Sequence, residues 1–343
     1  LPRSGRPVVL EWHKRRWKCE EPLCPQGSWT ETSQAIVPRR VLTERAASDI
    51  ARRIGEKGDT PAELAREFGI SWSGAWNAFE RYATPKVEDP ARMGDVDTLG
   101  VDETSYLKAT QDSHTQYMTG FVDLSGDSPR LLDVVEGRSG ADVAGWLKQQ
   151  SPEWLKQVDT VALDPHRGYA NGLQKGLSHA DFVLDHFHAI KLANKRIDQV
   201  RCRIQNQTLG HRGRKLDPLY RVRKLLLCAR ERLSPVGAAK LEAVLAVGDP
   251  DGEVTAAYIG KELLRDVYAS ATLEEAKPKL LVFYSHCTNH HIPELRSLAK
   301  TISAWQNELF NYWHTSHTSN GPTEAMNLLI KKIKRAGHGY RNF

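Results

Sequence analysis

The chain has 343 residues, of which 40% are hydrophobic and 26% are charged, which fits a globular protein of two or three domains. A chain of this length can bury a large core without disulfides. Its five cysteines are an odd and mostly dispersed set, which argues against a secreted disulfide framework. No apolar run reaches about 18 residues and no signal peptide is visible, so we expect a cytoplasmic protein with no membrane partner. Because the first residue is leucine, we also expect the chain to be part of a longer protein.

The basic residues are concentrated locally. The formal net charge is +6, and four short basic runs occupy residues 12–18, 211–215, 221–224 and 331–335. Such runs are common on solvated helix faces. Four of them, one interleaved with tryptophan, favour a nucleic-acid partner.

Residues 1–38 are basic and strand-like and contain a cysteine pair. Cys19 and Cys24 enclose the four residues EEPL. A tetrahedral zinc ion needs two such pairs, so this is half of a zinc site, or two reduced thiols. We interpret residues 1–38 as a partial zinc-binding module whose missing ligands, and with them Zn²⁺, depend on the full-length protein.

The pattern becomes helical in residues 39–83. Thr60 is placed to cap a helix that starts at Pro61, with Glu63 completing a capping box. Gly69 can end that helix in a left-handed conformation, and Ser71 can cap the next one. This spacing predicts a helix-turn-helix, and the alternative is an ordinary helical hairpin.

Small and apolar side chains of this segment predict its packing, and polar ones predict its partner. Ala65, Ile70 and Trp76 fall where the two helices must touch. The second helix would offer four side chains to the major groove of double-stranded DNA. These are Trp72, Ser73, Asn77 and Arg81.

Residues 84–96 are polar and rich in proline, which predicts a linker. Beyond them the hydrophobic period changes to two, and five strands are expected at 97–107, 114–124, 130–137, 158–164 and 180–185. Helical segments at 140–149 and 168–176 separate the last strands. Three strands followed by alternating helix and strand indicate a mixed α/β sheet, and the pattern is helical for more than a hundred residues after the fifth strand. Proline breaks are expected in that stretch at residues 218, 235, 250, 278 and 293.

Three acidic residues stand at the ends of elements far apart in sequence. Asp102 lies in the first strand, Asp164 ends the fourth, and Glu324 lies in the first turn of a final amphipathic helix. If they converge, their repulsion calls for a divalent cation such as Mg²⁺ or Mn²⁺, and two such ions can promote phosphoryl transfer. Alternatively each acid has a local role, as a strand-end, turn or helix-terminal charge. Lys331 and Arg335 share the helix face of Glu324, where they could neutralise DNA phosphates.

Four blocks of sequence resemble the DDE transposases of the L-three family of insertion sequences. They are GVDETSY, LDPHRGY, DHFHAIKLANKRIDQVR and TSNGPTEAMNLLIKKIKRAGHGYRNF. The resemblance covers nearly the whole chain and implies an RNase H-like catalytic domain at 97–343, interrupted by an all-helical insertion at about 190–312. Carried over residue by residue, the family's acidic triad falls on Asp102, Asp164 and Glu324.

The sequence departs from the family in three places. Members carry two cysteine pairs where this chain has one, and His186 stands where arginine is usual. The tail that follows YRNF in the family is missing. These departures predict a weaker phosphate contact at residue 186 and a truncated or degenerate copy.

The resemblance implies a bacterial transposase that cleaves and joins strands at insertion-sequence ends. We expect it to bind terminal inverted repeats and target DNA as a homo-oligomer, in the cytoplasm and with the nucleoid. Two alternatives remain open. One is a catalytically dead or truncated remnant that only binds DNA, and the other is a metal-dependent nuclease of the same fold.

Other candidates have simpler explanations. Asp185 and His188 lie at a strand-to-helix junction, where Asp185 can cap the helix. The segment SHCTNHH, residues 285–291, has metal-ligand residue types in poor spacing and is expected to be a polar loop. Trp305 and Trp313 are expected in the core.

Overall fold

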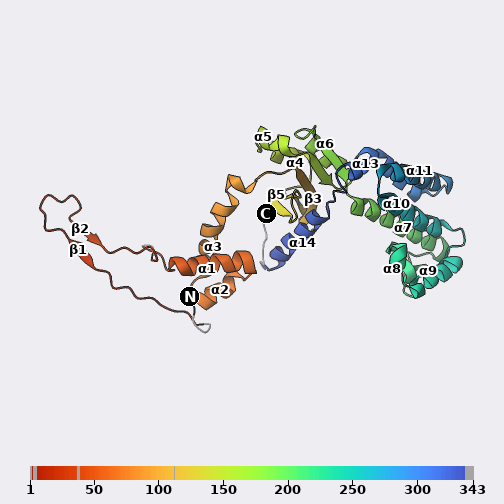
Figure 1. The fold of residues 1–343 in the computed structure, drawn as a ribbon. Coiled ribbons are helices and arrows are strands. Elements are labelled where there is room, and N and C mark those ends of the chain that lie inside the picture. The colour runs from red at the N-terminus through yellow and green to blue at the C-terminus, as the bar shows by residue number, and fades with distance from the viewer. Residues whose placement is uncertain (1, 3–5, 37–38, 112, 337–343) are drawn as a thin grey trace. The chain divides into compact units, whose positions relative to one another are not determined.

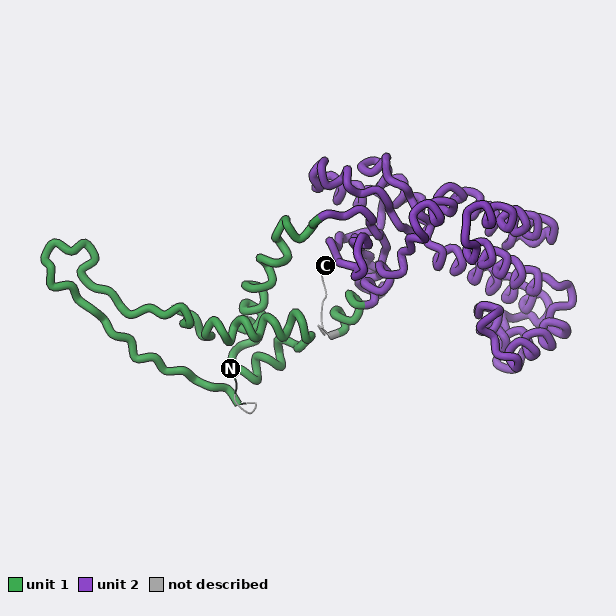
Figure 2. Tube along the Cα trace, in the orientation of Figure 1, with its two compact units in different colours: residues 1–94, 329–343 green, residues 95–328 purple. Residues whose placement is uncertain are grey.

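A computed structural model describes residues 2, 6–36, 39–111 and 113–336 of the chain. Contacts divide the chain into two compact units (Figure 2). The first contains Leu1–Gly94 with Leu329–Phe343, and the second contains Asp95–Leu328. Within the described ranges no helix is both long and apolar enough to span a lipid bilayer.

The first unit begins with a short hairpin and continues as helices (Figure 1). Strands β1 (Arg16–Lys18) and β2 (Ser28–Thr30) are antiparallel, with Trp17 opposite Trp29. The helical elements that follow are α1 (Glu44–Arg52), a π-helical turn (Arg53–Lys57), α2 (Pro61–Phe68) and α3 (Trp72–Val87).

The predicted caps of α2 and α3 are confirmed. Thr60 and Glu63 form a reciprocal capping box before Pro61, Gly69 ends α2 with a φ of 67°, and the Ser71 hydroxyl accepts the N–H of Gly74. A small core forms where the three helices meet. Its buried members are Ala47, Ile50, Leu64, Ala65, Ala75 and Ala78.

Helix α3 is longer than predicted. It runs through Pro85 to Val87, and a 3₁₀ turn (Pro90–Arg92) follows, so the proline-rich stretch starting at residue 84 does not begin as an irregular linker. Proline interrupts a helix because it lacks an N–H and crowds the carbonyl four residues earlier. Pro85 lies in the last turn, where only one backbone bond is affected.

The second unit contains a five-stranded mixed sheet, which confirms the predicted α/β class. Its strands are β3 (Thr98–Leu107), β4 (Gln116–Asp123), β5 (Arg130–Glu136), β6 (Thr160–Leu163) and β7 (Asp181–Leu184). They lie in the order β5-β4-β3-β6-β7. Strand β4 is antiparallel to both of its neighbours, β3 and β5, and β6 and β7 run parallel to β3.

One face of this sheet is covered by α4 (Gly140–Leu147) and α6 (Arg167–Gln174). Trp146 of α4 stacks on Phe121 of β4 with ring centroids 3.8 Å apart. The Thr119 hydroxyl, on the same face of β4, lies 2.7 Å from the Tyr169 hydroxyl of α6. A short helix that was not predicted from the sequence, α5 (Pro152–Gln157), leads into β6.

Residues 186–314 are helical apart from short connections. The helices are α7 (His186–Leu209), α8 (Pro218–Leu227), α9 (Pro235–Gly248), α10 (Glu253–Tyr268), α11 (Leu273–Asn289), α12 (Pro293–Ala304) and α13 (Gln306–His314), with a 3₁₀ turn at Arg230–Arg232. Proline is the first residue of α8, α9 and α12, as expected at a position that needs no N–H partner. Pro278 lies inside α11, so the break predicted there is wrong. The last helix, α14 (Gly321–Ala336), follows.

Candidate active site

Three neighbouring strands each end their paired segment with an apolar residue followed by an aspartate. In the parallel register Val101 of β3 is opposite Leu163 of β6, and Leu163 is opposite Leu184 of β7. The next residues are Asp102, Asp164 and Asp185. Because the strands are in register, these aspartates lie at one level across the carboxyl ends of β6 and β7, where open α/β sheets build their sites.

Asp102 is a buried acid with an abnormal pKa. It is 6% exposed, and burial together with the negative charge of Asp164 raises its pKa to about 7. Two neutral donors act in the opposite direction: the Asn327 amide donates to Oδ2 at 2.7 Å and the Glu103 backbone N–H to Oδ1 at 2.7 Å. Charge at Asp102 is therefore disfavoured, as expected for two carboxylates that share a poorly solvated site.

Asp164 and Asp185 share one histidine. His188 Nδ1 lies 2.7 Å from Asp164 Oδ1 and 2.9 Å from Asp185 Oδ2. Although burial alone lowers the pKa of His188, the two carboxylates raise it to about 9. A ring nitrogen carries one proton, and the contact with Asp185 has hydrogen-bond geometry. Asp164 Oδ1 is consequently buried without a hydrogen bond.

Asp185 caps α7, as predicted, and also anchors the segment before α14. Its Oδ2 accepts the His188 backbone N–H at 3.1 Å, and its Oδ1 accepts the Asn320 N–H at 2.9 Å and the Ser319 hydroxyl at 3.1 Å. Burial acts to raise the pKa of Asp185, but these donors and the nearby histidine charge lower it overall. This acid is saturated by protein groups.

The start of α14 packs on the sheet face opposite α4. The Asn320 side chain donates to the Val101 carbonyl at 3.0 Å, and Asn327 binds Asp102. Thr323 lies over Gly100, where an added Cβ would come within 2.1 Å of the threonine Oγ1. A glycine is required at position 100 for this close approach. The sequence reading missed the roles of Asn320 and Asn327, although Asn327 lies three residues after Glu324 and so on the same helix face.

Glu324 lies between these contacts. It is half-buried in the first turn of α14, one residue after Thr323 and three before Asn327, and its N–H donates to the Asn320 carbonyl. Across the described part of the chain, no three His, Cys, Asp or Glu side chains are grouped so as to hold a metal ion. The structure thus brings Asp102 and Asp164 together, and it places Glu324 on the helix that packs beside them.

The donor set of the acid pair fits a divalent cation. Asp164 offers a buried oxygen that lacks a hydrogen bond, and the pKa of Asp102 is raised because Asp164 repels its charge. Carboxylate oxygens are the preferred ligands of hard divalent ions, and such an ion removes the repulsion.

Comparison with known proteins identifies the family. The model of the DDE transposase family ISL3, described as a transposase, matches residues 99–343, which is more than half of the chain. The chain belongs to the ISL3 family of DDE transposases. A relative, the transposase for insertion sequence element IS1001 of Bordetella parapertussis, is 24% identical over 351 aligned positions that cover 100% of this chain and 80% of the relative.

The first unit of the transposase exposes the side chains expected to contact DNA. All four are at the surface: Trp72, Ser73, Asn77 and Arg81. Arg81 nevertheless has a protein partner, since its guanidinium lies 2.7 Å from a Glu44 carboxylate oxygen. The Tyr82 hydroxyl donates to the other Glu44 oxygen at 2.7 Å. Arg81 is therefore tied to α1.

The predicted packing residues of this segment are distributed differently. Ala65 is buried in the three-helix core and Ile70 packs against it. Trp76 instead stacks on Trp72, with ring centroids 5.6 Å apart and planes 8° from parallel. The pair forms an aromatic strip along α3, because residues four apart lie on one side of a helix.

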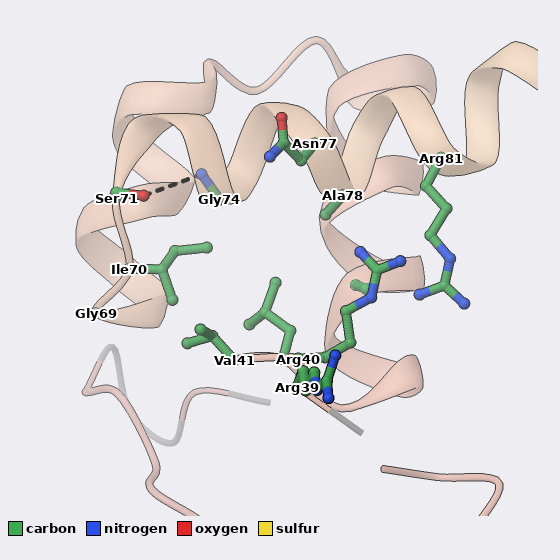
Figure 3. Close-up of a pocket in the computed structure, with 12 residues that line it drawn as sticks. Arg39, Arg40, Val41, Gly69, Ile70, Ser71, Gly74, Asn77, Ala78 and Arg81 are labelled. Atoms are coloured by element: carbon green, nitrogen blue, oxygen red, sulfur yellow. Dashed lines mark hydrogen bonds between the residues drawn. The ribbon is translucent and has the colours of Figure 1, made fainter. Parts of the chain in front are cut away.

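A basic pocket adjoins this helix (Figure 3). It has a volume of about 460 Å³, with Ser71 and Ile70 at one end and the arginines at the other. The segment before α1 forms one wall, and the turn before α3 with the Gly74–Arg81 face of α3 forms the other. The charged and polar lining residues are Arg39, Arg40, Ser71, Asn77 and Arg81.

The cysteine pair lies at the end of the hairpin. The Cys19 N–H donates to the Gly27 carbonyl at 2.8 Å. The backbone N–H groups of Gln26 and Gly27, together with Cys19, lower the pKa of the Cys24 thiol. Thiolates are the metal-binding form of cysteine, so this turn favours the ligating state.

The last helix presents apolar side chains to solvent. Leu328, Leu329 and Ile333 are all exposed, while Asn327 on the polar face is buried. Of the predicted phosphate contacts, Lys331 is half-buried and Arg335 is exposed. The sequence YRNF at 340–343 lies outside the described residues.

Two minor candidates are resolved by their surroundings. SHCTNHH does not begin as a polar loop, since α11 continues through Asn289, and His286 Nε2 lies 2.8 Å from the Ala256 carbonyl. The apolar spacing of Phe283 and Cys287, both buried, keeps this segment helical. Trp305 is buried as predicted, and half-buried Trp313 donates to the Ser270 carbonyl at 3.0 Å.

Proposed function

We propose that Asp102, Asp164 and Glu324 are the catalytic acids of this transposase and hold a divalent ion, Mg²⁺ or Mn²⁺. The observation that carries the proposal is the strand register that places Asp102 beside Asp164 in a family of DDE transposases. The raised pKa of Asp102 supports it. Burying two carboxylates side by side is unfavourable, and such strained acids are found mainly at functional sites. Glu324 is included because it lies on α14 between Thr323, which packs over Gly100, and Asn327, which binds Asp102.

The chain's own residues would hold this site in shape. Asn327 fixes Asp102 by a hydrogen bond, His188 lies against Asp164 as a nearby positive charge, and Asp185 ties α7 to the segment before α14. A divalent ion bound to the acids would lower the pKa of a water and neutralise developing phosphate charge. We propose that water first cleaves the strand at the element's end, leaving a 3′ hydroxyl. That hydroxyl then attacks a target phosphodiester and displaces its 3′ oxygen.

We further propose an RNase H-like catalytic domain over 97–343, with an all-helical insertion at about 190–312. The support is the sheet order, in which three antiparallel strands are followed by two strands parallel to the first. The helices between β7 and α14 fill the interval proposed for the insertion. The domain boundaries at 38, 83 and 96 remain part of the proposal.

The DNA contacts proposed for residues 39–83 follow from exposure and charge. The side chains are Trp72, Ser73, Asn77 and Arg81, on a helix-turn-helix whose second helix adjoins the basic pocket. Arg39 and Arg40 add cations on the opposite wall of that pocket. Lys331 and Arg335 would neutralise phosphates near the scissile bond.

The remaining proposals concern partners and location. Residues 1–38 would be part of a zinc module, with Cys19 and Cys24 as two of four ligands, because the turn favours the thiolate form of Cys24. The substrates would be double-stranded terminal inverted repeats and target DNA, bound by a homo-oligomer. A protein that acts on bacterial DNA would work in the cytoplasm at the nucleoid.

The substitution Glu324→Gln tests the proposal. The glutamine keeps size but removes the charge that a metal requires. We expect it to bind terminal repeats like the parent and to lose magnesium-dependent nicking, measured on a labelled duplex. The control is Glu274→Gln, which also removes an acid from the first turn of a helix, α11, and should nick normally.

Equal nicking by both variants would remove Glu324 from the site. Strand cleavage by the parent without joining would favour the nuclease alternative. Magnesium-independent binding with no cleavage by the parent would favour the DNA-binding remnant.

A further inference from the structure

Three consecutive residues at the start of α7 point to three different surroundings. His186 packs in the helical region, with its ring centroid 6.0 Å from Tyr268 and 5.7 Å from Tyr312. His188 lies against Asp164. Phe187, between them, is 48% exposed. The helix thus presents an apolar ring to solvent at the edge of the acid pair.

The position of Phe187 distinguishes it from other exposed apolar residues. Single exposed hydrophobic side chains are ordinary on protein surfaces. This ring, however, lies edge-on to the His188 ring with centroids 5.5 Å apart, and His188 Nδ1 is 2.7 Å from Asp164. If the DNA end binds at the acid pair, a ring one residue removed from His188 would be close to the nucleotide whose phosphate is cleaved.

A cation accompanies the ring. Lys191 Nζ lies 5.8 Å from the Phe187 ring centroid and 3.5 Å from His188 Nε2. An exposed aromatic ring beside a lysine is the combination that holds an unpaired nucleotide, since the base stacks on the ring and the phosphate is near the charge. Within a duplex the bases are stacked on one another, so the ring would act where the strands separate at an end and a single base is free on its faces.

We propose that Phe187 stacks on an unpaired terminal base and positions the reacting strand end at the acid pair. This rests on the proposed function, because it takes the DNA end as substrate. Phe187 is a specificity residue for frayed ends and makes no contact with the reacting phosphorus. The exposed ring remains free to receive a base while His188 holds Asp164.

The experiment compares two DNA ends. One is a blunt duplex with the terminal sequence that flanks the coding element, and the other has a mismatched, frayed final pair. The full chain should prefer the frayed end, and Phe187→Ala should lose roughly five- to a hundred-fold of that preference, the range for one base–aromatic stack. Phe187→Trp should restore it. In parallel, 5-iodouracil at the terminal position should photocrosslink to residue 187.

The control is Leu209→Ala. Leu209 is on the same helix and is 47% exposed, nearly as much as Phe187, but it lies at the other end, roughly 30 Å away. This variant should keep the parental preference and crosslink. It separates base stacking from a general effect of removing an exposed apolar side chain.

Two failures have different meanings. If the parent neither binds nor nicks either end, the proposed function is wrong and the role of Phe187 falls with it. If the parent nicks, and Phe187→Ala keeps the frayed-end preference or the crosslink maps to another residue, only the role of Phe187 is wrong. Equal parental binding to both ends, with nicking intact, also overturns it.

Discussion

Acidic side chains meet opposite conditions in two regions of the chain. In the helical region, Arg203 binds Glu253 and Glu294 together. Hydrogen bonds and charge from Arg203 lower the pKa of Glu294. Arg265 likewise joins Glu231 to Glu262. Each of these acids has an arginine of the same region as its partner.

Asp102 and Asp164 have different surroundings. Asp102 receives hydrogen bonds from neutral groups, and its pKa rises to about 7 because it is buried beside Asp164. Asp164 meets a histidine, not an arginine, and keeps one buried oxygen without a hydrogen bond. The acids of the helical region are thus satisfied within the protein. On the proposed assignment, Asp102 and Asp164 would instead be satisfied by a bound cation that takes part in the chemistry.

The largest effect that we expect is the loss of DNA nicking when an acid of the proposed site is neutralised. Asp102→Asn should reduce magnesium-dependent nicking roughly a thousand-fold or more, because several kcal/mol of barrier reduction depend on the metal. It should leave folding intact, since the amide removes a charge that burial disfavours. A nicking assay with a thermal melt checks both. Parental nicking by Asp102→Asn would show that Asp102 holds no essential ion.

The next largest effect that we expect is a loss of stability when an arginine that bridges two acids of the helical region is removed. Arg203→Met should destabilise the protein by about 3 kcal/mol, the low end for a broken buried pair, because the Arg203 side chain is 27% exposed. Glu253 and Glu294 then face each other without the arginine that bridges them. Urea unfolding measures the change. Exposed Lys195→Met on the same helix is the control, and an equal loss in both would mean that the arginine bridge adds no specific stability.

The third prediction concerns how the stability of the protein depends on pH through Asp102. The pKa of Asp102 is about 7 in the folded chain and near 4 when unfolded, so the folded state binds its proton more tightly. Its contribution to stability is full below about pH 4 and is lost as pH rises through about 7. In chelated buffer the parent should lose up to about 4 kcal/mol relative to Asp102→Asn over this window, at about 1.4 kcal/mol for each unit of the shift. Parallel melting curves for the two proteins from pH 4 to 8 would contradict the assignment.

The smallest effect concerns the first unit, where one acid restrains a proposed DNA contact. Glu44→Gln should release Arg81 and raise DNA affinity roughly two- to five-fold, the scale of an exposed ion pair. Fluorescence anisotropy with a terminal-repeat duplex measures it. Glu56→Gln removes the same charge from an exposed position nearby and corrects for the general gain in positive charge. Identical affinities for the two variants would argue against Arg81 as a restrained contact.

Local features of the fold could be predicted because local chemistry decides them. The caps at Thr60, Gly69 and Ser71 follow from backbone groups within three residues, and the five strands follow from alternation. The helix breaks predicted at two prolines are absent for a different reason. Pro85 and Pro278 lie inside helices because packing of the whole helix outweighs one lost backbone bond.

The surroundings of the acids could not be predicted from local pattern. Asn327 meets Asp102 across 225 residues, and Asn320 meets Val101 across 219. The strand register that aligns Asp102 with Asp164 is likewise a long-range property. A signal was present in part, since each of the five predicted strands carries an apolar residue followed by aspartate. This pattern alone does not show which of the five acids lie side by side. The fold shows that Asp102, Asp164 and Asp185 are the aligned ones, and that Asp185 binds the segment before α14 in addition to its predicted helix cap.

The long sequence separation of the contacts that α14 makes with the sheet has a consequence during protein synthesis. Every contact of Asn320, Thr323 and Asn327 with the sheet joins the end of the chain to strands made some two hundred residues earlier. A product that stops before residue 320 lacks Glu324 and the groups that hold Asp102, yet keeps the whole of helices α1–α3. Domains fold as they emerge, N-terminal first. On the proposed assignment of DNA contacts, each prematurely ended chain would occupy a DNA end without cutting it. Errors in translation would thereby limit transposition.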